Sequence, residues 1–229
     1  PARTPVPASA SEPVRARLAA LQARPLDVVV VDQVRTALHN ARQEMEMVLR
    51  YGALSEDLCD LHTELPLITD ANGQMISGRF GSFVAHLIHS QDLHFSPGDV
   101  LLQSDPYLSG GAVSHLNDWM VLTPVFYGVE LIGFTAMVGH ISDAGGAMAG
   151  SMPAQASSIF SEGVRIPPIK IVEGDVVNEA ALQLILTNSR TPDKNRTDLM
   201  ALIAGCRAGQ EQVIGLCDRF GPELYHRAC

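Results

Sequence analysis

The amino-acid sequence predicts an α+β fold in which antiparallel β-hairpins, or a mixed sheet, pack against helices. Three observations carry this prediction. Apolar residues recur every three or four positions after Asp27, and again over residues 178–188 and 197–219, as in amphipathic helices. Two apolar runs of strand length follow each other between residues 120 and 138. The 229 residues, 46% of them hydrophobic and 18% charged, are enough for a globular protein with a sizeable core.

The first predicted element is a long helix that begins after Asp27, a favourable N-cap residue. Residues 1–25 are rich in Pro, Ala, Ser and Arg, so we expect a poorly ordered N-terminal extension there and a single domain over residues 26–229. Apolar residues at spacings of three and four predict the buried stripe of the helix: Val31, Val34, Leu38, Ala41, Met45 and Val48.

Turn residues delimit the elements that follow this helix. Asn72-Gly73 lies between two apolar runs, which is a strong signal for a β-hairpin. Gly98, in a Ser-Pro-Gly-Asp turn, precedes a further apolar run. The elements predicted in this part of the chain are strands over residues 65–69 and 74–77, a helix over 83–93 and a strand over 100–103.

About twenty residues before His140 are almost wholly apolar, which is enough to cross a bilayer. Glu130 lies in their middle, however, and prolines and glycines interrupt them. A buried hairpin with strands over residues 120–127 and 131–138 explains this pattern better than a membrane span. The segment from His140 to Ser158 is rich in Gly, Ala, Ser and Pro and is too long for an ordinary connection, so we expect it to be functional.

The net charge of −9 weighs against two classes of partner. The sequence has no basic stripe that would neutralise phosphates, so we expect no nucleic-acid partner. An acidic surface also repels anionic membranes, so we expect no membrane partner. The cysteines form no C-x-x-C pair, which favours reduced thiols and a cytoplasmic protein. They are Cys59, Cys206, Cys217 and Cys229.

The predicted hairpin brings metal-ligating residue types together at one end. If its turn is centred on residues 128–129, the numbers of paired residues sum to about 257. Asp118 then lies opposite Gly139, next to His140. His115 precedes Asp118 by three residues and can fold back over the same end if the chain turns there. We therefore predict that His115, Asp118 and His140 form a site for one divalent metal ion.

Two imidazoles and one carboxylate are a sensible ligand set, because they leave coordination positions open for water or substrate. Such a site can polarise a carbonyl or stabilise an enolate, and Mn²⁺, Zn²⁺ and Fe²⁺ are all compatible with it. Asp143 is close enough in sequence to be a catalytic proton-transfer group. The alternative is structural, because a single histidine at a strand end is more often a packing residue. Non-haem Fe(II) oxygenases use similar ligands but favour His-x-Asp spacing.

Several motifs in one order resemble the hydantoinase B/oxoprolinase family, including the alpha-type subunit of acetone and acetophenone carboxylases. The resemblance extends from about Val28 to Gly209. The matching residues are Gly98-Asp99-Val100, Ser104-Asp105-Pro106-Tyr107, Ser114-His115-Leu116-Asn117-Asp118, Gly139-His140, Gly145-Gly146, Gly150-Ser151-Met152-Pro153, Arg165-Ile166-Pro167-Pro168 and Asn188-Ser189-Arg190-Thr191-Pro192.

This resemblance implies that the chain is part of a larger multi-subunit enzyme. His115, Asp118 and His140 are at the positions that match the metal ligands of the family. No Gly-Lys-Ser/Thr motif for ATP is present, so ATP would be used by an actin-like, ATP-binding hydantoinase A-type partner subunit. A small third subunit is a further expected partner. The chain has roughly half the usual length of the family, which makes residues 26–229 resemble its N-terminal half.

The resemblance leaves three functions open. The first is the metal-binding catalytic subunit of an ATP-dependent carboxylase that acts on a ketone. The second is a subunit of an ATP-dependent cyclic-amide hydrolase, such as a hydantoinase, oxoprolinase or lactamase. The third is a degenerate, non-catalytic scaffold subunit, which the short length and a divergent first block favour. Asp105, Tyr107 and His86 are predicted to line a substrate channel, and Arg165 to pair with Glu162.

Overall fold

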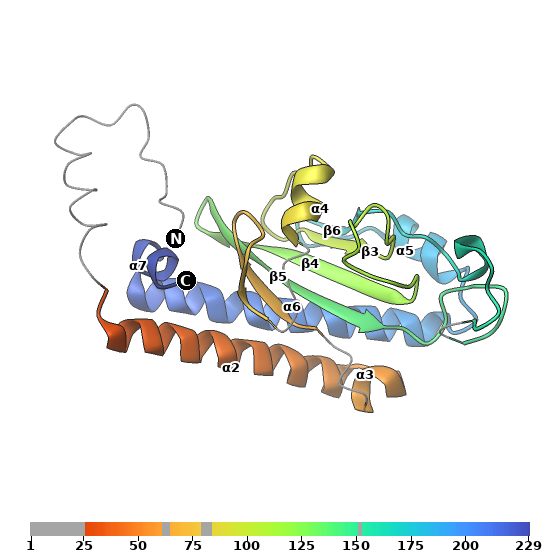
Figure 1. Cartoon of the computed structure of the whole chain (residues 1–229), viewed down its shortest axis with the longest axis horizontal. Coiled ribbons are helices and arrows are strands. Elements are labelled where there is room, and N and C mark those ends of the chain that lie inside the picture. The colour runs from red at the N-terminus through yellow and green to blue at the C-terminus, as the bar shows by residue number, and fades with distance from the viewer. Residues whose placement is uncertain (1–25, 61–64, 79–83, 151–152) are drawn as a thin grey trace.

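The computed structural model describes residues 26–60, 65–78, 84–150 and 153–229. Within these residues, one antiparallel sheet packs against two long helices, and a short helix covers part of its other face (Figure 1). This is the α+β fold that the sequence predicts. The predicted N-terminal extension, residues 1–25, lies outside the described residues.

Helix α2 spans Val28–Gly52 and begins at the predicted N-cap. The carboxylate of Asp27 accepts a hydrogen bond of 2.9 Å from the backbone N–H of Val29, which satisfies one of the free donors of the first turn. A second helix, α3 (Glu56–Asp60), follows and was not predicted. It has only five residues, too few for a helical periodicity to be recognised in the sequence.

The buried stripe of α2 differs at its ends from the prediction. Val31 and Val48 are only half-buried, whereas Leu49 is fully buried. Leu49 continues the spacing of four from Met45, and this spacing keeps a side chain on the core-facing side of a helix. The buried side chains of α2 are Val34, Leu38, Ala41, Met45 and Leu49.

The sheet of the described residues has the strand order β2-β1-β5-β4-β3-β6-β7, and all neighbouring strands are antiparallel. The five predicted strands are present, each within two residues of the predicted ends. The strands are β1 (Leu67–Asp70), β2 (Met75–Ser77), β3 (Val100–Gln103), β4 (Asp118–Tyr127), β5 (Glu130–His140), β6 (Ile169–Glu173) and β7 (Val176–Val177).

Strands β6 and β7 form a hairpin that the sequence analysis did not predict. Its turn is Gly174-Asp175, and both residues have positive φ, at 54° and 66°. Two left-handed residues in succession are typical of the tight turns that join β-hairpins, and Gly and Asp tolerate this conformation well. A Gly-Asp pair after an apolar run was therefore a usable hairpin signal.

Helix α6 (Pro192–Phe220) lies beside α2 and packs on β4 and β5 (Figure 1). It begins five residues before the predicted residue 197, because Pro192 occupies the first turn, where its missing N–H is not needed. Side-chain hydrogen bonds join α6 to the hairpin of β4 and β5. Thr135 Oγ1 donates to the carbonyl of Cys206, Cys206 Sγ donates to that of Val121, and Gln210 Nε2 donates to that of Pro124. The neighbouring helices are α5 (Glu179–Leu186) and the unpredicted α7 (Pro222–Ala228).

The other face of the sheet is covered by α4 (Val84–Ser90) and by the loop before β4. Helix α4 is shorter than the predicted span of 83–93, and Asp92, with a φ of 47°, follows its end. The short 3₁₀ helix η1 (Ile159–Ser161) lies within the Gly- and Ser-rich region. In the part of the chain that the structure describes, no helix is long and apolar enough to cross a membrane.

Candidate functional site

The hairpin of β4 and β5 carries two of the three predicted metal ligands. A β-bulge between Val125 and Phe126 shifts the pairing by one residue relative to the predicted register. At the far end of the hairpin, Asp118 therefore faces His140 directly, instead of Gly139 as predicted. Paired residues of antiparallel strands point to the same face, so the two side chains stand side by side.

Asp118 and His140 form a hydrogen-bonded pair. His140 Nδ1 lies 2.8 Å from Asp118 Oδ1, and because a carboxylate only accepts, Nδ1 carries the proton. In the neutral imidazole, Nε2 then holds the lone pair. The amide nitrogen Nδ2 of Asn117 makes its closest contact with Nε2 of His140. It lies 3.1 Å from Nδ1 of the same ring. The side chains of His140 and Asp118 are 16% and 19% exposed, so solvent reaches the pair.

Asp118 is poised to remain an anion. Its burial alone would raise its pKa, but hydrogen bonds from the imidazole of His140 and from the backbone N–H of His115 outweigh this effect. The backbone N–H of Ser114 acts in the same direction, so the pKa of Asp118 lies below its ordinary value of 3.8. A carboxylate with a low pKa is available as an acceptor or a metal ligand at neutral pH.

His115 is close to this pair through the backbone. The N–H groups of Ser114 and His115 donate to Asp118 Oδ2 over 3.3 and 3.1 Å, and the N–H of Asp118 donates to the carbonyl of His115. The chain therefore turns immediately before β4, as the predicted site requires. His115 itself is exposed.

The fit of these residues to a metal ion is partial. Asp118 and His140 place a carboxylate and an imidazole side by side, two groups that divalent ions bind, but their closest atoms, Oδ1 and the protonated Nδ1, are hydrogen-bonded to each other. Among the described residues, however, no three His, Cys, Asp or Glu side chains are grouped closely enough to hold an ion. The ring of His115 is thus not gathered with the other two. The three-ligand site stays a prediction.

Asp143, the predicted catalytic group, is buried and paired. It is 3% exposed, and its carboxylate accepts from the backbone N–H of Gly145 over 2.7 Å and from Arg190 Nη1 over 3.1 Å. Arg190 also donates to the carbonyls of Gly146 and Met148, so it holds the whole start of the glycine-rich segment. The proton-transfer role of Asp143 stays a prediction. The contacts of Asp143 are those of a residue that orders the glycine-rich segment.

Asp105 and Tyr107 are predicted to line a substrate channel, and the structure places an arginine with them. Both Nε and Nη2 of Arg165 donate to Asp105 Oδ2, over 3.1 and 2.7 Å. The prediction that Arg165 pairs with Glu162 is therefore wrong. The guanidinium carbon of Arg165 also lies 5.4 Å from the ring centre of Tyr107 and 5.8 Å from that of Phe160, within cation–π range.

His86 lies on α4 and is exposed. Its ring packs directly against Gly110, so closely that a side chain on Gly110 would overlap it. Gly110 belongs to the loop between β3 and β4, residues 104–117. His86 is thus in contact with the loop that carries three other predicted site residues, Asp105, Tyr107 and His115.

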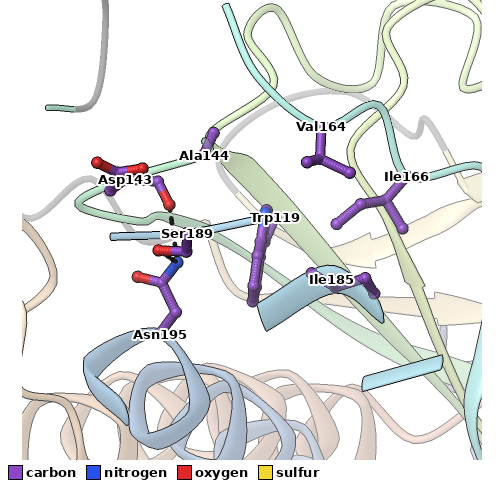
Figure 2. Close-up of a pocket in the computed structure, with 8 residues that line it drawn as sticks. All are labelled: Trp119, Asp143, Ala144, Val164, Ile166, Ile185, Ser189 and Asn195. Atoms are coloured by element: carbon purple, nitrogen blue, oxygen red, sulfur yellow. Dashed lines mark hydrogen bonds between the residues drawn. The ribbon is translucent and has the colours of Figure 1, made fainter. Parts of the chain in front are cut away.

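A narrow crevice lies behind β4, on the face that the helices cover (Figure 2). Its apolar wall includes Val164, Ile166 and Ile185, and Asn195 borders its polar end. The indole Nε1 of Trp119 is buried and has no hydrogen-bond partner among the described residues. Because neighbouring residues of a strand point to opposite faces, this crevice is separated by the sheet from Asp118.

The sequence analysis assigned no role to four polar residues of this region. Asn117 directly precedes β4 and lies between predicted ligands in the sequence, a position that could have identified it. The other three become neighbours of the segment after His140 only in the folded chain: Arg190, Asn195 and Asp198.

The sequence was also compared with known proteins. A model of the family described as hydantoinase B/oxoprolinase matches residues 27–229. The chain is 31% identical over 213 residues to the caprolactamase subunit beta of Pseudomonas jessenii, which covers 89% of this chain and 36% of that protein. It is 28% identical over 166 residues to the acetophenone carboxylase delta subunit of Aromatoleum aromaticum, which covers 69% of this chain and 24% of that protein.

Two solved structures share the fold. ATP-dependent caprolactamase from Pseudomonas jessenii superposes with a TM-score of 0.79 at 28% identity and covers 90% of this chain and 36% of its own. Nucleotide-free acetone carboxylase superposes with a TM-score of 0.80 at 20% identity, covering 93% of this chain and 29% of its own. The chain therefore spans about a third of the length of these relatives, less than the half that the resemblance implied.

Proposed function

The chain belongs to the hydantoinase B/oxoprolinase family, and we propose that it is part of a subunit of an ATP-dependent enzyme that opens a cyclic amide. The Asp118–His140 pair would lie in the reacting centre. The observation that carries the proposal is the direct contact of these two side chains at a partly exposed hairpin end, in a chain that resembles a lactam-hydrolysing subunit over 89% of its length.

We further propose that His115, Asp118 and His140 hold one divalent ion, with Mn²⁺, Zn²⁺ or Fe²⁺ as candidates. Such an ion supplies Lewis acidity that polarises a carbonyl or a bound water. The protein's own contribution is to keep Asp118 ionised and to orient the ring of His140 through its Nδ1–H. His115 would have to turn its exposed ring towards this pair, which its position in the adjacent turn permits.

ATP would be used by a separate subunit. The partner proposed from the family resemblance is the actin-like, ATP-binding hydantoinase A-type subunit, with a small third subunit as a further candidate. Relatives such as caprolactamase subunit beta and acetophenone carboxylase delta subunit are themselves named as subunits, which supports a multi-subunit enzyme. The partly exposed pair of Asp118 and His140 would act on a substrate that the partner has activated.

Carboxylation of a ketone is the second candidate. The likeness to the acetophenone carboxylase subunit supports it, at 28% identity over 69% of the chain. The likeness to caprolactamase subunit beta is higher in identity and covers more of the chain, at 31% and 89%, so we favour the cyclic amide. A non-catalytic scaffold subunit is the third candidate.

Isotope and ATPase assays on the full-length protein with its partner subunits test these proposals. We expect ATP hydrolysis that is stimulated by a lactam, by 5-oxoproline or by a hydantoin, and that needs no bicarbonate. Incorporation of ¹⁴C-bicarbonate into acetone or acetophenone, with ATP hydrolysis dependent on bicarbonate, would support the ketone instead. Full turnover by the D118N and H140A variants would favour the scaffold.

A further inference from the structure

The backbone that follows His140 is held from the helix side by two residues of α6. Asn195 and Asp198 are both fully buried and lie three residues apart, which places them on the same face of the helix. Asn195 Nδ2 donates over 2.8 Å to the backbone carbonyl of Asp143, three residues beyond His140. Figure 2 shows Asn195 extending from the helix towards Asp143 and Ser189.

Asp198 reaches the same segment through a serine. Its Oδ1 accepts from the backbone N–H groups of Leu54 and Ser55, over 2.7 and 3.1 Å, and its Oδ2 accepts from the Ser55 hydroxyl. Because that hydroxyl has already donated its proton, its oxygen can only accept from the Ser142 hydroxyl, 2.8 Å away. The hydrogen bonds therefore all point one way: Ser142 donates to Ser55, and Ser55 donates to Asp198.

These contacts are unlike ordinary core packing in one respect. Among the described residues, the hydrogen-bonding partners of Asp198 are two backbone amides and a hydroxyl, all of them neutral. Burying a carboxylate against neutral donors is expensive, and an apolar residue would fill the same space at lower cost. The outcome of this arrangement is that residues 142 and 143, directly beyond the strand end, are both tied to α6.

We propose that Asn195 and Asp198 are positioning residues that fix His140 relative to Asp118. This inference rests on the proposed function of that pair. His140 is the last residue of β5, and strand ends open more readily than strand centres. Anchoring the next residues limits that opening and holds the imidazole within the small tolerance that a reacting or metal-binding group requires.

The chain offers a matched control at the opposite end of the same hairpin. Gln210, also on α6, donates through Nε2 over 3.0 Å to the backbone carbonyl of Pro124 on β4. Asn195 and Gln210 thus make the same type of bond, from a carboxamide of one helix to a carbonyl of the hairpin region. They differ in their distance along the chain from the Asp118–His140 pair.

The test compares N195A, S142A and Q210A in the full-length protein. Deuterium exchange is measured by mass spectrometry for a peptide that contains residues 139–146, and Mn²⁺ binding is measured by calorimetry with the metal alone. We expect faster exchange of this peptide and at least tenfold weaker Mn²⁺ binding for N195A and S142A. We expect Q210A to match the wild type in both, even if its thermal midpoint is lower. S142A removes a single hydroxyl, so it keeps the test valid if N195A does not fold.

The proposal is overturned if the 139–146 peptide of N195A and S142A exchanges as in the wild type. It is equally overturned if Q210A weakens Mn²⁺ binding as much as they do, since the contacts would then support the fold in general. If the wild type binds no Mn²⁺, Zn²⁺ or Fe²⁺, the proposed metal site fails. The positioning of His140 is then decided by the exchange measurement alone.

Discussion

Asp118 and His140 face each other across β4 and β5 because the hairpin contains one unpaired residue. Val125 pairs with Gly133, whereas the next residue along β4 pairs with Leu131, which leaves Ile132 without a partner in the register. A shift of one residue in the register of two paired strands gives each residue a different partner on the opposite strand. The bulge thereby converts a diagonal neighbour of Asp118 into its direct partner.

Loss of any predicted ligand should weaken metal binding. We expect D118N, H140A and H115A each to lower the affinity for Mn²⁺ on the order of 100-fold or more, since each removes one donor of three. H94A changes an exposed histidine elsewhere and should bind as the wild type does. Metal content by mass spectrometry and affinity by calorimetry check this. Unchanged affinity in H115A alone would limit the site to the Asp118–His140 pair.

The Asp105–Arg165 pair should contribute more to stability than a surface pair. Asp105 is 2% exposed, so R165A leaves a buried carboxylate without its cation and should lower the free energy of unfolding by about 1–3 kcal/mol. R165K keeps the charge but loses the two-pronged geometry of the guanidinium. Its free energy of unfolding should lie between those of the wild type and R165A. The exposed pair of Arg196 and Glu179 is the control, and R196A should lower the free energy of unfolding by clearly less than R165A does. Urea unfolding that gave equal losses for R165A and R196A would contradict this assignment.

Asp99 should make the fold sensitive to acid. Burial alone would raise its pKa, but the Lys170 ammonium at 2.8 Å and the backbone N–H groups of Ser96 and Gly174 outweigh it and hold the pKa below 3.8. The stabilisation from a depressed pKa is complete above 3.8 and is lost as the pH falls through the lower, folded-state value. D99N should therefore be less stable than the wild type at pH 7, and the difference should shrink below pH 3.8. If urea titrations gave the same difference in free energy of unfolding between wild type and D99N at pH 7 and at pH 2, the assigned role of Asp99 would be refuted.

The indole nitrogen of Trp119 should matter little for stability. It is a buried donor without a partner among the described residues, a situation that carries a desolvation cost of about 1–3 kcal/mol. W119F removes this donor and part of the ring, and the two effects oppose each other. We expect its free energy of unfolding to stay within about 1 kcal/mol of the wild type, whereas W119A should lose about 3–5 kcal/mol. A loss above 2 kcal/mol in W119F would mean that Nε1 has an acceptor in solution.

Alanine substitutions at Gly110 and Gly111 distinguish the cost of backbone strain from the cost of steric overlap. Both have positive φ, at 65° and 85°, but a Cβ at Gly110 would overlap the ring of His86, whereas one at Gly111 meets open space. G111A should lose about 1–2 kcal/mol from strain, and G110A should lose more. The double variant G110A/H86A should recover part of the stability that G110A loses, because the overlapping ring is absent. Chemical unfolding of the four proteins measures this, and equal losses for both alanines would exclude the close contact with His86.

Much of the fold could be predicted from local sequence. The N-cap at Asp27, the turn at Asn72-Gly73 and the apolar strand patterns depend on neighbouring residues, and these elements lie within two residues of their predicted ends. Short elements were missed for a physical reason. Helix α3 has only five residues, and a helix this short depends on packing against other elements. Strand β7 has only two residues, too few for an apolar pattern, although its turn was a usable signal.

The candidate site divides in the same way. The closeness of Asp118 and His140 could be predicted from the sequence, because a hairpin brings the start of one strand to the end of the next. The membership of His115 in a metal site stays a prediction. The contact between Asp118 and His140 depended on a bulge, which a sum of residue numbers does not reveal. The pairing of Asp105 with Arg165, sixty residues away, depended on how the loops pack.

The sequence by itself determined the class of fold, the hairpin and the residue types that meet at its end, because periodicity and turn chemistry act over a few neighbouring residues. Tertiary structure alone decided which side chains touch there. Asn195 and Asp198 come to the segment after His140 only when α6 packs on the sheet, more than fifty residues along the chain. Such contacts follow from the packing of whole elements, and no local pattern encodes them.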